Sequence, residues 1–342
     1  MMTVVLAGGS GFLGSKLRAH LELGGHRVLT LTRSPRPDRP DDIAWQPDGS
    51  GGELARHLEG IDAVVNLAGE NIAGTFWSPA RKAKLRDSRL LATRTIARAI
   101  SACARPPKTL ISGSAVGYYG ARGDELVTER TPAGTDFLAE LCIDWEQEAR
   151  AGELAQTRLA IVRSGLVLGA DGGALKKMIL PFKLGLGATL GSGQQYMPWI
   201  HVDDWVALVA WLIATDRAAG AFNATAPTPV TNREFTRTLG RVVRRPAVFQ
   251  APAFVLRIGL GEMADMLLTG QRVLPAAAEE LGFRFAHRQL EPALRSLDLC
   301  ETRSQSLPSP SRPSRRSHRT KRDALPIRSS CSTRSWRRPT SP

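Results

Sequence analysis

Thr3-Val4-Val5-Leu6-Ala7-Gly8-Gly9-Ser10-Gly11-Phe12-Leu13-Gly14 begins as an apolar run and continues into a cluster of glycines. The run predicts a strand, and the residues after it have the amphipathic pattern of a helix. A strand, a tight glycine turn and a helix start together form the dinucleotide-binding corner of a Rossmann fold, in which free helix N–H groups bind phosphate. Gly8 would supply the turn, Gly11 would let the backbone approach a pyrophosphate, and Gly14 would let the helix pack on the strand. We predict cofactor contacts from these three glycines and from Phe12 and Leu13.

The second predicted strand spans Arg27–Arg33, and the residues at its end indicate which dinucleotide the chain binds. Sites that prefer NAD usually place Asp or Glu there, where the carboxylate binds the ribose 2′-OH. This chain has Thr32 and Arg33 instead. A guanidinium can make a charge-assisted bond to a 2′-phosphate, so the sequence favours NADP(H) over NAD(H). The alternative is that Arg33 is a solvated surface side chain.

Composition narrows the class of protein. The chain has 342 residues, of which 42% are hydrophobic, enough for a substantial core in one or two domains. It shows no secretory signal pattern, and its longest strongly apolar stretch, 206–214, is too short to span a bilayer. Four cysteines without CxxC spacing (Cys103, Cys142, Cys300 and Cys331) indicate neither zinc nor disulfides. We expect a cytoplasmic protein with no membrane partner.

The net charge of +14 is concentrated at one end of the chain. Residues 298–342 carry eleven Arg and Lys against three Asp and Glu, and they are rich in Ser and Pro. This composition predicts a disordered basic tail. Pieces such as 311–316 could bind RNA or an anionic surface. A non-functional extension, read through a shifted frame, is the alternative that we favour, because the fold pattern ends abruptly near Leu297. No specific nucleic-acid partner is expected.

Strand and helix patterns alternate through the first half, which is typical of a parallel sheet covered on both faces. Predicted strands span 61–69, 109–114 and 157–163, and predicted helices span 79–102 and 136–151. Ligands of such sheets bind beyond the carboxyl ends of the strands. The residues at those ends are Ser10, Arg33, Ala68, Ser114 and Gly165. We expect them to converge on one crevice.

The second half has a different character. Residues 165–193 are rich in glycine, with a short apolar stretch at 178–182. Helices are predicted over 203–215, 232–243 and 252–268, and a short strand over 222–224. The predicted fold is α/β, a Rossmann-type doubly wound parallel sheet (1–165) with a smaller C-terminal α/β cap on the substrate side (166–297). Part of this second region would complete the sheet, and 298–342 would be the tail.

Six stretches, in this order, resemble the extended and atypical short-chain dehydrogenase/reductases, and among them the epimerase family group of NADP-binding proteins. The stretches are 8–14, 66–72, 163–169, 198–204, 222–227 and 270–275. The resemblance covers about residues 1–297. It implies NADP(H) as the cofactor and a C-terminal extension domain. It also implies cofactor contacts from Leu67, Ala68, Gly69 and Val167.

One feature of the resemblance is missing. Active members use a Ser together with a Tyr-x-x-x-Lys pair, whose spacing places both side chains on one face of a helix. Helix 136–151 has neither residue at that place; Leu138 and Cys142 have the spacing instead. Ser114 matches the serine, although it could simply be a small residue that closes a strand. Tyr118 and Tyr119 are the phenols beside it. They could replace the lost Tyr, or they could be packing or substrate-wall residues.

Helix 79–102 and the segment around His201 hold further candidates. Arg89 matches a position where the superfamily usually has Asn, and it could reach cofactor phosphates or a substrate anion. Lys84 is a weaker candidate for the same role, and a solvated helix face is the alternative for both. His201 has no second His at ligand spacing, so we interpret it as structural or substrate-lining and expect no metal.

Two functions follow from these features. The first is an NADP(H)-binding, epimerase-like oxidoreductase with Ser114, Tyr118 and Tyr119 as catalytic candidates. Its substrate would be a nucleotide sugar or another small carbonyl or polyol compound. The alternative is a non-catalytic NADP(H)-binding redox sensor or scaffold. In this superfamily a pair of helices commonly forms a homodimer, and helix 79–102 is the candidate element.

Overall fold

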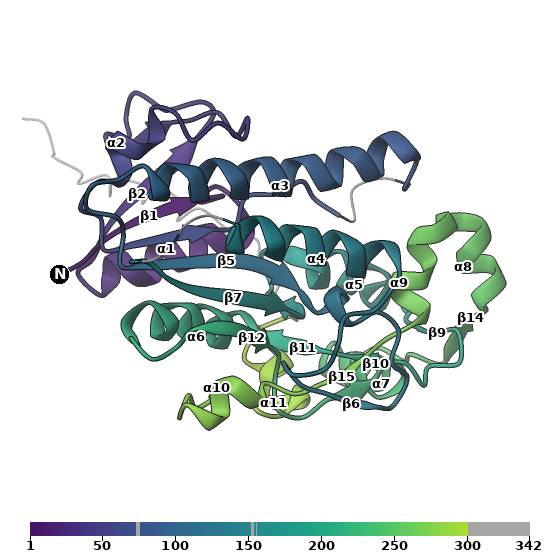
Figure 1. Ribbon diagram of the computed structural model, residues 1–342. Coiled ribbons are helices and arrows are strands. Elements are labelled where there is room, and N and C mark those ends of the chain that lie inside the picture. The colour runs from purple at the N-terminus through teal and green to yellow at the C-terminus, as the bar shows by residue number, and fades with distance from the viewer. Residues whose placement is uncertain (73–75, 152–153, 155, 300–342) are drawn as a thin grey trace, which may run out of the picture. The chain divides into compact units, whose positions relative to one another are not determined.

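A seven-stranded parallel sheet forms the centre of the computed structural model, which describes residues 1–72, 76–151, 154 and 156–299 (Figure 1). From one edge to the other, the strands are β12 (Gly220–Ala224), β7 (Arg158–Ser164), β5 (Thr109–Ala115), β4 (Ala63–Asn66), β1 (Thr3–Ala7), β2 (Arg27–Thr32) and β3 (Asp42–Ala44). The chain adds β2 and β3 on one side of β1 and the other strands on the opposite side. The order therefore reverses between β1 and β4, as in a doubly wound Rossmann sheet.

Alternating side chains of β1 explain how both faces of the sheet are covered. Val4 and Leu6 point into one apolar core, and Val5 and Ala7 into another. Helices α1 (Phe12–Leu23) and α6 (Val202–Ala214) cover the first face. Helices α2 (Leu54–Leu58) and α3 (Pro79–Ser101) cover the second, and α4 (Phe137–Arg150) packs beside α3 (Figure 1). The fold class predicted from the sequence is confirmed.

The second half of the chain builds short strand pairs and small helices. The pairs are β8 (Leu166–Leu168) with β11 (Trp199–His201), β9 (Ala188–Leu190) with β14 (Phe249–Ala251), β10 (Tyr196–Met197) with β13 (Val230–Thr231), and β15 (Arg272–Val273) with β6 (Leu126–Val127). The helices are α5 (Gly173–Lys183), α7 (Asn232–Val242), α8 (Ala253–Leu260), η2 (Gly261–Ala264), α9 (Asp265–Leu268), α10 (Ala276–Glu280) and α11 (Leu290–Arg295). A separate core that includes Trp199, Phe235 and Leu294 holds this part together.

Two elements differ from the sequence prediction. Helix α5 lies in the stretch interpreted only as glycine-rich, and its Leu175, Ile179 and Phe182 form a buried stripe. Glycines at its start and Pro181 near its end lower its helical propensity, which hid it. The predicted helix over 252–268 is divided into α8, η2 and α9 at Gly261, whose φ is +57°. Thr231 caps α7, because its hydroxyl accepts the Glu234 N–H.

Other expectations stay predictions. The described residues belong to one compact unit, Met1–Glu301, and the boundary predicted near residue 165 is not tested. The basic tail lies outside the described residues from position 300 onward. Within the described part of the chain, no helix is both long enough and apolar enough to cross a bilayer.

Candidate functional site

The glycine turn between β1 and α1 has the tight geometry that the sequence predicts. Gly8 has a φ of +80°, and its carbonyl accepts the Gly11 N–H at 3.0 Å. A β-carbon at Gly14 would lie 2.3 Å from the Gly8 carbonyl oxygen, so only glycine fits there. A β-carbon at Gly11 would have no neighbour closer than 3.3 Å. The turn is therefore closed at Gly8 and Gly14 and is less crowded at Gly11.

Phe12 connects this turn to the glycine-rich segment after β8. Its ring lies so close to Gly169 and Gly172 that a β-carbon at either would come within 2.4 Å of the ring. Leu13 is half-buried, and Val167 of β8 is buried in the core beneath α1. The glycines of this segment thus make room for an aromatic ring beside the helix start.

Charged side chains collect beside the ends of β2 and β4. Arg33 is exposed at the end of β2, and its charge, with that of Lys84, acts on Glu70. A hydrogen bond from Arg81 is the main cause that lowers the pKa of Glu70. Thr32 accepts the Ser34 N–H and stiffens the turn after β2. The predicted NADP-selecting arginine and Lys84 therefore lie near one carboxylate, Glu70, which sequence reasoning did not single out.

Arg89 of α3 reaches the loop after β4. Its guanidinium donates to the Glu70 carbonyl at 3.0 Å and to the Leu85 carbonyl at 2.9 Å, and it lies 5.3 Å from the Trp145 ring. Its aliphatic part packs against Gly69. Ala68 caps the end of β4 by donating its N–H to Asn66. Leu67, Ala68 and Gly69 thus lie at the carboxyl edge of the sheet, with Arg89 holding their loop.

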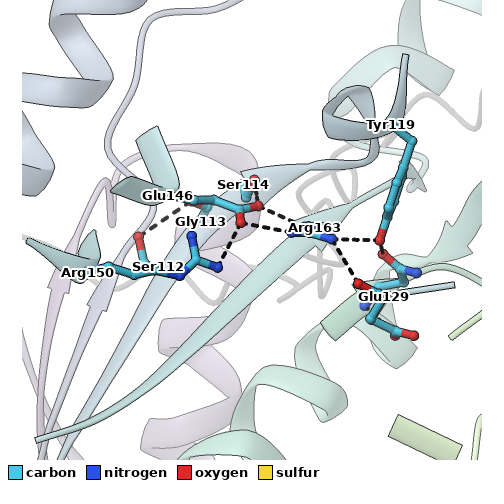
Figure 2. Close-up of polar contacts among 9 residues, drawn as sticks. Ser112, Gly113, Ser114, Tyr119, Glu129, Glu146, Arg150 and Arg163 are labelled. Carbon is cyan, nitrogen blue, oxygen red and sulfur yellow. Dashed lines mark hydrogen bonds and ion pairs between the residues drawn. The ribbon is translucent and has the colours of Figure 1, made fainter. Parts of the chain in front are cut away.

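A buried ion pair lies beneath the end of β5 (Figure 2). The Ser114 hydroxyl donates to Glu146 Oε1 at 2.8 Å. Glu146, on α4, accepts two hydrogen bonds from Arg163 of β7, at 2.8 and 2.9 Å. Both charged side chains are nearly inaccessible, at 1% and 4% exposed. Burial raises the pKa of Glu146, but the Arg163 bonds and charge outweigh it and lower the pKa overall.

The two predicted phenols have different surroundings, although both lie in η1 (Val116–Tyr119). The Tyr119 hydroxyl donates to Asn223 Oδ1 at 2.7 Å and accepts from Arg163 at 2.9 Å. Burial raises the pKa of Tyr119 to about 12, so it keeps its proton at ordinary pH. Tyr118 is half-buried, and its ring lies face-on to the Arg163 guanidinium, 3.5 Å from Cζ to the ring centre.

Helix α4 places Leu138, Cys142 and Glu146 on one face, one turn apart. Leu138 packs directly against Gly117 of η1, where a β-carbon would lie 3.3 Å from its Cβ. Cys142 is buried, which raises the pKa of its thiol to about 11. The face turned toward Ser114 therefore offers a neutral thiol and an ionised carboxylate.

Two family models match the chain. The NAD-dependent epimerase/dehydratase family matches residues 4–224, and a domain of unknown function, DUF1731, matches residues 251–297. The first match spans more than half of the chain. The chain belongs to the NAD-dependent epimerase/dehydratase family. The resemblance stated from the sequence motifs is thereby confirmed.

Relatives support the same family. The chain is 44% identical to the epimerase family protein Mb2239 of Mycobacterium bovis over 293 residues, covering 85% of this chain and 96% of that protein. A crystal structure of human epimerase family protein SDR39U1 (isoform 2) with NADPH matches with a TM-score of 0.80 and 36% identity, covering 86% of this chain and 99% of that one. A nucleoside-diphosphate sugar epimerase from Corynebacterium glutamicum matches with a TM-score of 0.72 and 33% identity, covering 86% and 58%.

His201 ends β11, the strand that pairs with β8, and its surroundings are structural. It is 2% exposed, its Nδ1 accepts the Asp203 N–H at the start of α6, and its Nε2 lies 3.3 Å from the Ser296 hydroxyl. Its ring stacks on His287 at 3.8 Å. Within the described residues, His201, Asp203 and His287 could approach one metal ion. Both ring nitrogens of His201 are already engaged, and stacked rings do not aim their lone pairs at one point. The geometry favours a packing role.

Sequence reasoning missed the residues that organise the site of this family member. Glu146, Arg163, Asn223 and Glu129 form a connected set around Tyr119, and Glu129 accepts the Asn223 N–H at 2.9 Å. One signal was available. Arg163 and Asn223 are polar residues inside strands that the fold buries on both faces, and such residues need dedicated partners.

Proposed function

We propose that the chain binds NADP(H) at the carboxyl ends of β1, β2 and β4 and acts as an epimerase-like oxidoreductase on a small carbonyl or polyol compound. The glycine turn carries this proposal, because it joins β1 to α1 where the sheet order reverses, and Gly11 is its least crowded glycine. Arg33 supplies a cation at the end of β2. The human relative that matches this chain was solved with NADPH, which supports the same cofactor.

The chain's own residues divide the remaining work. The nicotinamide, when bound, donates or accepts the hydride. A proton must move at the substrate oxygen, and Tyr118 is the phenol that we assign to this step, because the Tyr119 hydroxyl is buried and engaged at both sides. Ser114 orients the substrate oxygen, since its hydroxyl is fixed by Glu146 while its oxygen can still accept. Tyr119 then has a supporting role.

A non-catalytic NADP(H)-binding sensor is the second candidate. Helix α4 contains neither Tyr nor Lys, and Leu138 and Cys142 occupy the two positions with the usual spacing. A leucine cannot carry a proton, and the Cys142 thiol, with its pKa raised to about 11 by burial, stays neutral. Oxidation of NADPH upon addition of carbonyl or nucleotide-sugar compounds would establish the enzyme, whereas binding without turnover favours the sensor.

The proposal also covers the cellular compartment and the oligomeric state of the chain. A cytoplasmic setting agrees with the free thiols of Cys103 and Cys142. A homodimer through α3 is proposed only because helix pairs commonly form dimers in this superfamily. Light scattering of the full chain would distinguish a monomer from a dimer.

The cofactor proposal predicts that Arg33→Ala weakens NADPH binding far more than NADH binding. Losing a charge-assisted bond to the 2′-phosphate, of about 1.5–3 kcal/mol, corresponds to a roughly ten- to hundredfold loss of affinity for NADPH. Nicotinamide fluorescence titrations of the full chain with both cofactors measure this difference.

Arg27→Ala is the matched control, because Arg27 begins the same strand at the opposite end and pairs with Asp41 at the surface. It should leave both affinities unchanged. Equal losses for NADPH and NADH in Arg33→Ala would refute the specificity argument. Absence of binding by the unaltered chain would refute the cofactor proposal itself.

A further inference from the structure

Arginine side chains line a shallow, open cavity at the C-terminal end of α7. The cavity has a volume of about 400 Å³ and is lined by Arg237, Gly240, Arg241, Arg244, Arg245, Pro246 and Ala247. All four arginines are exposed. None of these residues belongs to the glycine turn or to the network around Arg163.

The positive charge of this cavity is largely uncompensated. Arg241 pairs with Glu291 at 2.9 Å, but that carboxylate is shared with Arg295. Across the part of the chain that the structure describes, Arg237, Arg244 and Arg245 have no carboxylate within ion-pair distance. Three guanidinium charges therefore face one open cavity.

Arg244 occupies a backbone position that favours glycine. Its φ is +56°, a left-handed conformation that a β-carbon disfavours. The turn closes α7 in the usual way, with the Arg245 N–H donating to the Gly240 carbonyl at 2.9 Å. Glycine is the common residue at this place after a helix. In this chain an arginine occupies the position despite the preference for glycine, and its side chain lines the cavity.

Close packing holds the turn against the helix. A β-carbon at Gly240 would lie 2.9 Å from the Arg245 carbonyl oxygen and 3.0 Å from Ala247 Cβ. Arg237 and Arg241 are four residues apart and share one face of α7. The helix arginines and the turn arginines are thus held around the same space.

The helix dipole explains only part of this arrangement. Cations in the last turn of a helix interact favourably with its C-terminal end. That effect accounts for Arg241 and Arg244. Arg237 lies before the last turn of α7, which ends at Val242, and it still lines the cavity.

We propose that this cavity binds the diphosphate group of a small ligand. The planar guanidinium fork matches phosphate oxygens, and a diphosphate carries enough negative charge for three unpaired guanidiniums, which a single carboxylate does not. Gly240, Pro246 and Ala247 complete the lining of the cavity. Free pyrophosphate and a nucleoside diphosphate share this chemistry.

Isothermal titration of the full chain with pyrophosphate and with ADP tests the proposal. NADPH is left out, because its own diphosphate would compete for the cavity. We expect one saturable site that Arg244→Gly and Arg237→Ala weaken roughly ten- to hundredfold, whereas ligand bound at the glycine turn after β1 would not respond to these variants. Arg244→Gly should keep or raise the melting temperature, because glycine suits the positive φ at this position. Tighter binding of ADP than of pyrophosphate identifies a nucleotide ligand, and equal binding identifies the diphosphate alone.

Arg233→Ala is the control, since Arg233 is an exposed arginine of the same helix that donates to the Ser192 carbonyl outside the cavity. An equal loss in Arg233→Ala, or no loss in Arg244→Gly and Arg237→Ala, overturns the proposal. So does a chain that shows no saturable diphosphate site but binds a single-stranded oligonucleotide through Arg244, because the surface would then serve a nucleic acid. The comparison between variants does not depend on NADPH binding, so the two proposals can fail separately.

Discussion

Arg163 is a charged side chain in the interior, and hydrogen bonds on all three of its nitrogens keep it there. Two donate to Glu146, and the third donates to Tyr119. Burial acts to lower the pKa of Arg163, but these bonds outweigh it and raise the pKa overall. A buried pair of this kind contributes little net stability, yet removing one partner leaves the other charge without compensation.

Arg163→Met should therefore lower the free energy of unfolding by about 3–5 kcal/mol, because Glu146 would remain buried without its partner. Arg150→Met is the control. Arg150 binds the same carboxylate at 3.1 Å but is 49% exposed, so its loss should change stability by under about 1 kcal/mol. Urea unfolding at pH 7 compares the variants. Adding Glu146→Gln to Arg163→Met should recover part of the loss, and similar losses for Arg163→Met and Arg150→Met would contradict this account.

At the scale of single residues, the sequence predicted candidates but not their surroundings. Ser114 is a candidate because it matches the serine of the resembled superfamily, and both tyrosines are candidates because they lie beside it. What separates Tyr118 from Tyr119 is Asn223, which lies 104 positions along the chain from Tyr119 and bonds its hydroxyl. No local pattern carries that information, because the contact exists only after β12 has joined the sheet.

At the scale of elements, the corner of β1, the glycine turn and α1 could be predicted because its physics is local. The positive φ at Gly8 and the close approach at Gly14 follow from residues within one turn of each other. Helix α5 is the opposite case. Its glycines and Pro181 argue against a helix, and burial of Leu175, Ile179 and Phe182 against distant residues overrides that preference.

Substitutions at Gly14 and Gly11 should separate an effect on stability from an effect on cofactor binding. Gly14→Ala places a β-carbon 2.3 Å from the Gly8 oxygen, so the helix must shift, and we expect a loss of about 1–3 kcal/mol in unfolding free energy. Gly11→Ala meets only one atom, at 3.3 Å, and should lower stability by under about 1 kcal/mol. Thermal unfolding and NADPH titration of both variants measure the two effects. Stable Gly11→Ala protein that still binds NADPH normally would show that the pyrophosphate does not approach this position.

At the scale of the whole molecule, α6 connects the sheet to the end of the described chain. Asp204 in its first turn is 3% exposed, and its two oxygens accept the N–H groups of Ala286 and His287 at 2.9 and 2.8 Å. The sequence predicted a helix over 203–215, and α6 begins one residue earlier, at Val202. It could not predict that Asp204 also holds a segment more than eighty residues later.

Asp204→Ala should release that segment. Each lost hydrogen bond to the carboxylate is worth about 1.5–3 kcal/mol. Limited proteolysis should then show new cleavage within 283–299, together with a lower urea midpoint. Asp203→Ala serves as the control, because Asp203 is exposed and both carboxylates face the same helix dipole. If both variants resist the protease equally, the Asp204 contacts do not hold the segment.

The long-range contacts of Glu129 bear on how the chain folds during translation. Its carboxylate accepts the N–H groups of Asn223 and Ala277, which lie 94 and 148 positions later. Both donors come from segments translated long after Glu129. Nearly the whole compact unit must therefore leave the ribosome before the interior around Glu129 can reach its final packing. The first strands can pair early during translation, but the final tertiary structure must wait for the late segment.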